Sequence, residues 1–303
     1  MGIQSLMSDP LEFLRGLLLS LPGILLALCG HEAAHAWVAY RCGDPTAKLM
    51  GRVTLNPLRH LDPLGFLCML FAGFGWAHPV PVNPNNFRHK RRDDLMVSLA
   101  GITANLIMCL IGFMMIMGLF ALAMNSLPTY DSMALFRAPE ETTFLMEYRN
   151  ETVLVCSEQN MYLSMDEVFQ LSSGLWHFGN GTGKYYGVVE LLINPTLGEI
   201  GGYAYEMLRY FMALNLTLAV FNLIPLPPLD GYHVVNDLLL RRPLFASAKA
   251  QRTGWLILVV LIMMGNYNED LDFLGKAIQF VQTNVFDGLT TLAHTIATHF
   301  SLI

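Results

Sequence analysis

Long apolar stretches separated by short polar segments dominate this sequence. A helix needs roughly 20 mainly apolar residues to cross a bilayer, and the candidates are residues 11–40, 95–124, 207–224 and 254–267. The pattern predicts an all-α polytopic membrane protein with four such helices. The C-terminal stretch 271–303 carries little charge, and it is either a fifth span or a helix lying in the membrane interface.

A shorter apolar stretch, residues 64–77, lies between the first two long ones. Apolar segments of about 10–14 residues are more typical of re-entrant or buried elements than of complete spans. The following residues, 78–92, contain three prolines and four cations, which favours a loop or a short extended strand. We therefore expect a re-entrant or short β-hairpin segment here.

Residues 125–205 are polar and acidic and lack a strong hydrophobic period. They predict an extramembrane insert in a single membrane-embedded domain, 1–303, whose core comprises 11–124 and 207–267. Only 14% of all residues are charged and 53% are apolar, against about a quarter charged in soluble domains. This composition favours a protein whose partner is the lipid bilayer.

Other classes of protein are disfavoured by what the composition lacks. No long basic stretch interleaved with aromatic residues suggests a nucleic-acid surface. The five cysteines include no C-x-x-C pair, so neither a disulfide framework nor a thiolate metal site is indicated.

Three polar segments carry four cations each: 41–59, 88–92 and 241–252. The positive-inside rule assigns all three to the cytoplasm and the insert to the other side. The stretches 11–40 and 207–224 then both run inwards, so that their C-terminal ends meet near the cytoplasmic face.

His31, Glu32 and His35 form an H-E-x-x-H motif at the end of the first apolar stretch. Residues four apart share one face of a helix, so both imidazoles can reach one ion. A catalytic zinc takes three protein ligands and keeps a fourth position for water, and Glu32 is placed to take a proton from that water. The alternative is a polar helix end whose side chains reach the membrane interface.

The third ligand must come from another segment, and Asp230 is the best candidate. It follows Pro225, Pro227 and Pro228, which interrupt the helix at 207–224. Irregular backbone at membrane depth is tolerated where it lines a wet cavity. The alternative is that Asp230 only caps a helix over 232–240.

His60 and Asp62 could be mistaken for a second metal-binding pair. Pro57 and Pro63 frame them as turn residues, which favours a role in ordering the loop. No spacing rule implicates His78 or His233.

The motifs and their surroundings resemble the site-2 protease family of intramembrane zinc metalloproteases, peptidase family M50, in its compact bacterial form without PDZ or CBS domains. The resemblance is carried by HEAAHAWVAYRCGDPTAKLMGRVTLNPLRHLDPLG, FGWAHPVPVNPNNFRHKRRDDLMVSLAG and NLTLAVFNLIPLPPLDG.

The resemblance implies Zn²⁺ held by His31, His35 and Asp230, with Glu32 as catalytic base. It also implies cleavage of a transmembrane substrate protein in a bacterial cell membrane, with the active site near the cytoplasmic side. Asn105 corresponds to a family asparagine that helps to polarise the scissile carbonyl, although Ile102 stands where the family has proline. The ordinary alternative for Asn105 is an amide that bonds across helices.

Two other functions would use the same ligands. A non-proteolytic zinc-containing scaffold or chaperone would have no need of Glu32 beside an open coordination position. A metal transporter would need further intramembrane carboxylates or histidines along a pathway, and residues 95–124 offer none.

Overall fold

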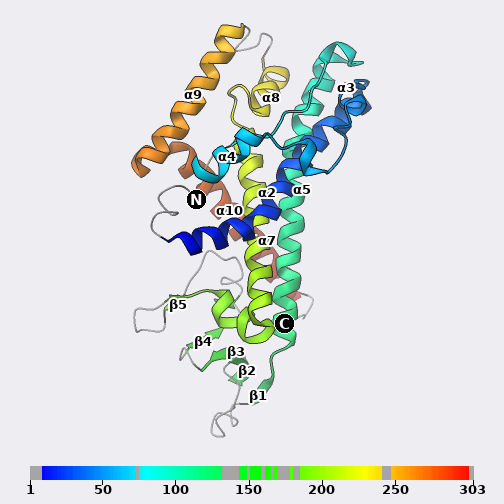
Figure 1. Ribbon diagram of the computed structural model, residues 1–303. Helices are drawn as coiled ribbons and strands as arrows, with labels where there is room; N and C mark the ends of the chain where they lie inside the picture. Colours follow the sequence, from blue (N-terminus) through cyan, green and yellow to red (C-terminus); the bar gives the residue numbers. More distant parts are fainter. Residues whose placement is uncertain are drawn as a thin grey trace. The chain divides into compact units, whose positions relative to one another are not determined.

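The computed structural model describes residues 9–72, 75–131, 143–148, 151–157, 161–164, 167–168, 178–179, 185–240 and 247–299. The chain forms two compact units. Unit 1 comprises Met1–Ile111 and Tyr210–Val281, and unit 2 comprises Gly112–Arg209 and Gln282–Ile303. Figure 1 labels most of the helices and strands. All predicted site residues belong to unit 1.

Three helices in the described part of the chain are long and apolar enough to cross a membrane. They are α2 (Pro10–Cys42), α5 (Lys90–Asn125) and the Ala248–Gly265 part of α9 (Ala248–Tyr267). The helices α7 (Asn194–Asn222) and α10 (Phe273–His299) are not among the three. The multi-pass architecture is therefore confirmed, and the total of four to five spans stays a prediction.

Helix α2 has clear signals at both ends. Asp9 precedes it and accepts a hydrogen bond from the Glu12 N–H, and Pro10 occupies the first helical position. At the other end Gly43 has a φ of 112°, in the left-handed region that favours glycine. Inside the helix, a Cβ on Gly30 would lie 2.6 Å from the Met108 side chain. Glycine at this position therefore leaves room for the Met108 side chain of α5.

In the segment between α2 and α5, the residues before α4 lie next to the residues after it. It contains α3 (Thr46–Leu49), η1 (Pro57–Arg59), α4 (Pro63–Ala72) and η2 (Pro84–Asn86). An antiparallel bridge joins Leu61 to Ala77, and the His78 N–H donates to the His60 carbonyl at 2.7 Å. The two ends of the short apolar segment therefore lie side by side, as a re-entrant element requires. Apart from this bridge, the described residues between α2 and α5 form no hairpin strands.

Asp44 orders the loops on both sides of α4. Its carboxylate is fully buried and accepts hydrogen bonds from the Thr46 N–H and hydroxyl, the Asn83 N–H and the Asn86 amide. Burial alone would raise the pKa of Asp44, but these hydrogen bonds lower it below its ordinary value. An ionised Asp44 thus ties residues 83–86 to the end of α2.

Unit 2 contains a small sheet, which corrects the all-α expectation. Its strands are β1 (Thr129–Asp131), β2 (Thr143–Tyr148), β3 (Glu151–Cys156) and β4 (Met161–Ser164), in that order. The pairing of β1 with β2 is parallel, and the other two pairings are antiparallel. Buried Phe144, Met146 and Val155 pack together.

The remainder of the insert differs from the expectation as well. A short pair, β5 (Phe178–Gly179) and β6 (Tyr185–Tyr186), precedes the π-helix η4 (Val189–Ile193). Helix α7 already begins at Asn194, so the last residues of the predicted insert are helical. Within α7, Gly198 has a φ of 69° and marks a kink.

Helix α8 (Asp230–Leu238) and η5 (Glu269–Leu271) complete the described elements of unit 1. The cations Arg241 and Arg242, used above to orient the chain, lie outside the described residues.

Candidate metal centre and active site

Three side chains from segments far apart in the sequence converge in unit 1. The Nε2 atoms of His31 and His35 lie 3.0 Å apart. Asp230 Oδ2 lies 3.3 Å from each of these nitrogens. Both histidines are buried. Within the described residues, this is the group of His, Cys, Asp or Glu side chains whose ligand atoms are close enough to share one metal ion.

The spacing of the three atoms fits a zinc ion. Zinc binds nitrogen and oxygen at about 2.0–2.2 Å with tetrahedral angles, which puts neighbouring ligand atoms about 3.3 Å apart. The observed separations are 3.0, 3.3 and 3.3 Å. In addition, Asp230 Oδ2 is buried and makes no hydrogen bond of good geometry to the described residues. A cation between the three atoms would satisfy that oxygen.

His35 is held in the tautomer that a metal ligand needs. Its Nδ1 lies 2.8 Å from the carbonyl oxygen of Val97 on α5. A carbonyl oxygen only accepts hydrogen bonds, so Nδ1 carries the proton and Nε2 presents its lone pair. A backbone carbonyl behind a ligating imidazole is a common way to fix the ring.

The other side of the site is closed by Gly101 on α5. A Cβ at this position would overlap His35 Nε2 and lie 2.5 Å from Cε1 of His31. No residue with a side chain therefore fits here unless the two imidazoles move. The sequence reasoning missed Gly101, although it lies four residues before Asn105 and thus on the same face of the helix.

Asp230 reaches the histidines because the chain breaks between α7 and α8. Residues 223–229 form turns after Asn222, and Asp230 is the first residue of α8. A Cβ on Gly231 would overlap the carbonyl of Leu223, so glycine is needed for α8 to start this close to the end of α7. Burial alone would raise the pKa of Asp230, but the two imidazoles beside it lower that pKa below its ordinary value. The carboxyl group is therefore ionised, as a ligand must be.

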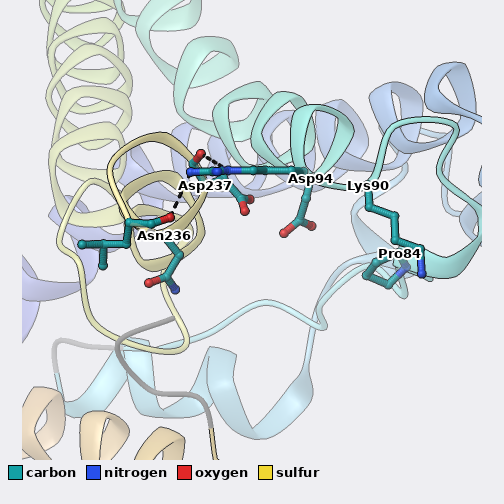
Figure 2. Close-up of a pocket in the computed structure, with 7 residues that line it drawn as sticks. Pro84, Lys90, Asp94, Asn236 and Asp237 are labelled. Carbon is teal, nitrogen blue, oxygen red and sulfur yellow. Dashed lines mark hydrogen bonds between the residues drawn. The ribbon is translucent and has the colours of Figure 1, made fainter. Parts of the chain in front are cut away.

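Three hydrogen bonds hold α8 and the residues after it against the beginning of α5. The Arg91 guanidinium donates to the carbonyl oxygens of Asp237 at 2.5 Å and Leu240 at 2.9 Å. His233 Nδ1 lies 3.1 Å from Asp94 Oδ2. Arg91, Asp94, Asp237 and Leu240 line a pocket of about 320 Å³, and Figure 2 shows Asp94 and Asp237 among its lining residues. Sequence reasoning missed the Asp94–His233 pair because neither residue belongs to a recognisable motif.

Glu32 is half-buried next to His31, and its Oε2 accepts a hydrogen bond from the Val80 N–H at 3.0 Å. The segment after α4 therefore fixes the direction of this carboxylate. Asp44 in turn holds the Asn83 N–H at 2.7 Å. The contact joins the predicted base to the end of the re-entrant segment.

His60 and Asp62 do not belong to the His31–His35–Asp230 cluster. His60 is buried and its Nε2 contacts the Thr54 carbonyl at 2.8 Å. Asp62 accepts a hydrogen bond from the Gly65 N–H at the start of α4. Both contacts agree with the predicted role in ordering the loop.

A buried His–His–Asp cluster of this kind could hold a metal ion, and its nitrogen and oxygen ligand atoms suit zinc. Comparison with known proteins agrees with a zinc site. Residues 20–265 match peptidase family M50, and the chain belongs to this family. Family membership, together with the names of the relatives below, indicates Zn²⁺ as the cofactor and a metalloprotease resembling site-2 proteases.

The similar proteins carry related names. The chain is 30% identical over 246 residues to "Putative zinc metalloprotease YwhC" of Bacillus subtilis, and the match covers 80% of each protein. It is 33% identical over 107 residues to "Putative zinc metalloprotease Rip2" of Mycolicibacterium smegmatis, which covers 34% of this chain and 41% of that protein. No solved structure matches.

Proposed function

We propose that this protein hydrolyses peptide bonds in or near transmembrane segments of membrane-tethered substrate proteins. His31, His35 and Asp230 are the proposed zinc ligands, and Glu32 is the proposed general base. The observation that carries the proposal is the convergence of three ligand atoms at tetrahedral spacing beside Glu32, in a protein with several apolar helices.

The reaction needs a water molecule, a base and an ionised ligand set. Zinc, when bound, acidifies a water molecule and polarises the scissile carbonyl. Glu32 accepts a proton from the attacking water and delivers it to the leaving amine. The Val80 N–H at 3.0 Å from Oε2 keeps the carboxylate in one orientation during both transfers.

The proposed location is a bacterial cell membrane with the active site near the cytoplasmic side. Support comes from the cations Arg41 and Lys48 at the histidine end of α2 and from the cations at 88–92 around the start of α5. The nearby aromatic rings fit an interface: Arg41 lies over the Trp37 ring, and Lys48 over the Tyr40 ring.

A substrate helix must unwind before cleavage, because its amides are shielded by helical hydrogen bonds. The sequence favours residues 80–83 as an edge for an unwound strand. However, Pro79 and Pro81 have no N–H group, and those of Val80 and Asn83 already donate to Glu32 and Asp44. Such an edge would therefore bind the substrate strand mainly through its carbonyl groups, which accept hydrogen bonds from the N–H groups of the substrate.

Replacing Glu32 by Gln tests the base assignment. The variant is expected to bind zinc stoichiometrically and to cleave a model transmembrane substrate about 10²–10⁴-fold more slowly, the usual contribution of a positioned base. Glu12→Gln on the same helix is the matched control, because Glu12 is exposed and distant in sequence from the site. Cleavage by the two variants would be measured by gel assay on purified protein in detergent.

Unchanged cleavage by Glu32→Gln would refute the assignment. Stoichiometric zinc in the wild-type protein without turnover of any transmembrane substrate would instead favour the scaffold alternative.

A further inference from the structure

Asn105 lies behind His31, on the side of the ring away from Asp230. It comes from α5 and is completely buried. Its Nδ2 is placed 3.3 Å from His31 Nδ1, whereas its Oδ1 is buried without a hydrogen-bond partner. A buried, unpaired amide oxygen next to a ring nitrogen needs an explanation.

The tautomer of His31 supplies one. Its Nε2 faces His35 Nε2 and Asp230 Oδ2, so this nitrogen must present its lone pair to an ion. The proton then resides on Nδ1, which becomes a donor. An amide nitrogen cannot accept that hydrogen bond, but an amide oxygen can.

Nitrogen and oxygen of a side-chain amide are assigned from their hydrogen bonds and not from shape. Rotating the Asn105 amide by half a turn puts Oδ1 at the place of Nδ2, within reach of the Nδ1–H. The rotation turns a contact between two nitrogens into a hydrogen bond and gives the unpaired oxygen a partner.

We propose that Asn105 is a positioning residue whose side-chain oxygen accepts the hydrogen bond of His31 Nδ1 and thereby fixes Nε2 as a metal ligand. The inference rests on the ligand set given under the proposed function. In this proposal, each imidazole donates its Nδ1–H to an oxygen atom on α5. His35 uses the Val97 carbonyl at 2.8 Å, and His31 uses the side chain of Asn105.

This role differs from polarising the scissile carbonyl. That task needs a donor directed at the substrate oxygen, whereas the observed contact is with the ring nitrogen of His31 on the side away from the other two ligand atoms. The two roles require opposite chemistry, since one uses the amide oxygen and the other the amide N–H.

Two substitutions at this position separate the roles. Asn105→Ala removes the acceptor and should weaken zinc binding about 10–100-fold, the usual effect of losing the partner behind a ligating histidine. Asn105→Asp keeps an acceptor oxygen but no donor, and it should retain zinc affinity close to that of the wild type. Zinc affinity is measured on the full chain in detergent by competition with a chromogenic chelator.

Asn215→Ala is the matched control for loss of a buried asparagine. Asn215 is also completely buried, and its amide donates to the Phe211 carbonyl of its own helix. This variant should bind zinc as the wild type does. The thermal midpoints of Asn215→Ala and Asn105→Ala in zinc-free buffer are compared, which shows how much stability each variant loses through the cavity alone.

Two results would overturn the inference. Wild-type zinc affinity in Asn105→Ala, combined with cleavage slower by about 10²–10³-fold, would assign Asn105 to the substrate oxygen. Equal loss of zinc affinity in Asn105→Ala and Asn105→Asp would mean that the amide N–H group, and not the amide oxygen, supports the site. A separate variant tests the ligand set: if Asp230→Ala binds zinc as tightly as the wild type, the proposed function fails instead.

Discussion

Replacing Gly101 by Ala tests whether the face of α5 forms a wall of the zinc site. The added methyl group would lie 2.5 Å from Cε1 of His31 and would overlap Nε2 of His35. Ordinary non-bonded contacts between carbon atoms are about 3.5 Å or longer, so each ring would have to move by about 1 Å. Metal sites accept deviations of only about 0.2 Å in ligand distance.

Overpacking of this kind costs about 1–3 kcal/mol. If this free energy destabilises the zinc-bound protein but not the zinc-free protein, the zinc dissociation constant rises about 5- to 150-fold, at 1.4 kcal/mol per factor of ten. Cleavage at limiting zinc should fall by a similar factor. Both are measured in detergent, zinc by chelator competition and cleavage on a model transmembrane substrate.

Gly118→Ala is the matched control, because it makes the same change on the same helix. A Cβ at Gly118 would meet no atom of the described residues within 4 Å. Alanine also has the higher helix propensity, so this variant should equal or exceed the wild type in stability and bind zinc unchanged. If Gly101→Ala binds zinc as tightly as Gly118→Ala does, the close contact inferred between α5 and the histidines is wrong.

Two further predictions concern groups outside the metal site. Asp44→Ala leaves four donors without their carboxylate and should lower the free energy of unfolding by about 3 kcal/mol or more; a thermal midpoint in detergent equal to that of the wild type would contradict this. Asp237→Asn should stabilise the protein more at pH 8 than at pH 5. Burial and the hydrogen-bonded Asp94 raise the pKa of Asp237 from 3.8 to about 6. Ionising Asp237 therefore destabilises the folded state increasingly as the pH rises from about 4 to about 6, and fully above pH 6. The difference between variant and wild-type thermal midpoints at the two pH values checks the sign.

The local motifs predicted which three side chains lie close together, because the pattern that places them is encoded in few residues; their role as zinc ligands stays a prediction. His31 and His35 share a helix face at a spacing of four, and Asp230 follows a run of prolines that ends a helix. The structure brings these three together within unit 1. The limits of α2 and α5 also agree with the apolar stretches to within a few residues.

The groups that support the ligands could not be predicted from the sequence. Gly101 matters because of a close approach between two helices, which has no signature in either helix alone. The Val97 contact uses a backbone carbonyl, which any residue supplies. The strands of the insert are short, from three to six residues in the main sheet, and too brief to produce a clear alternation of apolar and polar positions.

Helix α5 contacts the segments that carry every proposed ligand, and this has a consequence for how the family can vary. Arg91 and Asp94 contact α8, Val97 contacts His35, and Asn105 contacts His31. One inserted residue turns the rest of a helix by about 100°, which would direct one group of contacts away from the zinc whatever side chains were present. The number of residues between positions 91 and 105 therefore matters to the proposed site as much as the identities of Gly101 and Asn105 do.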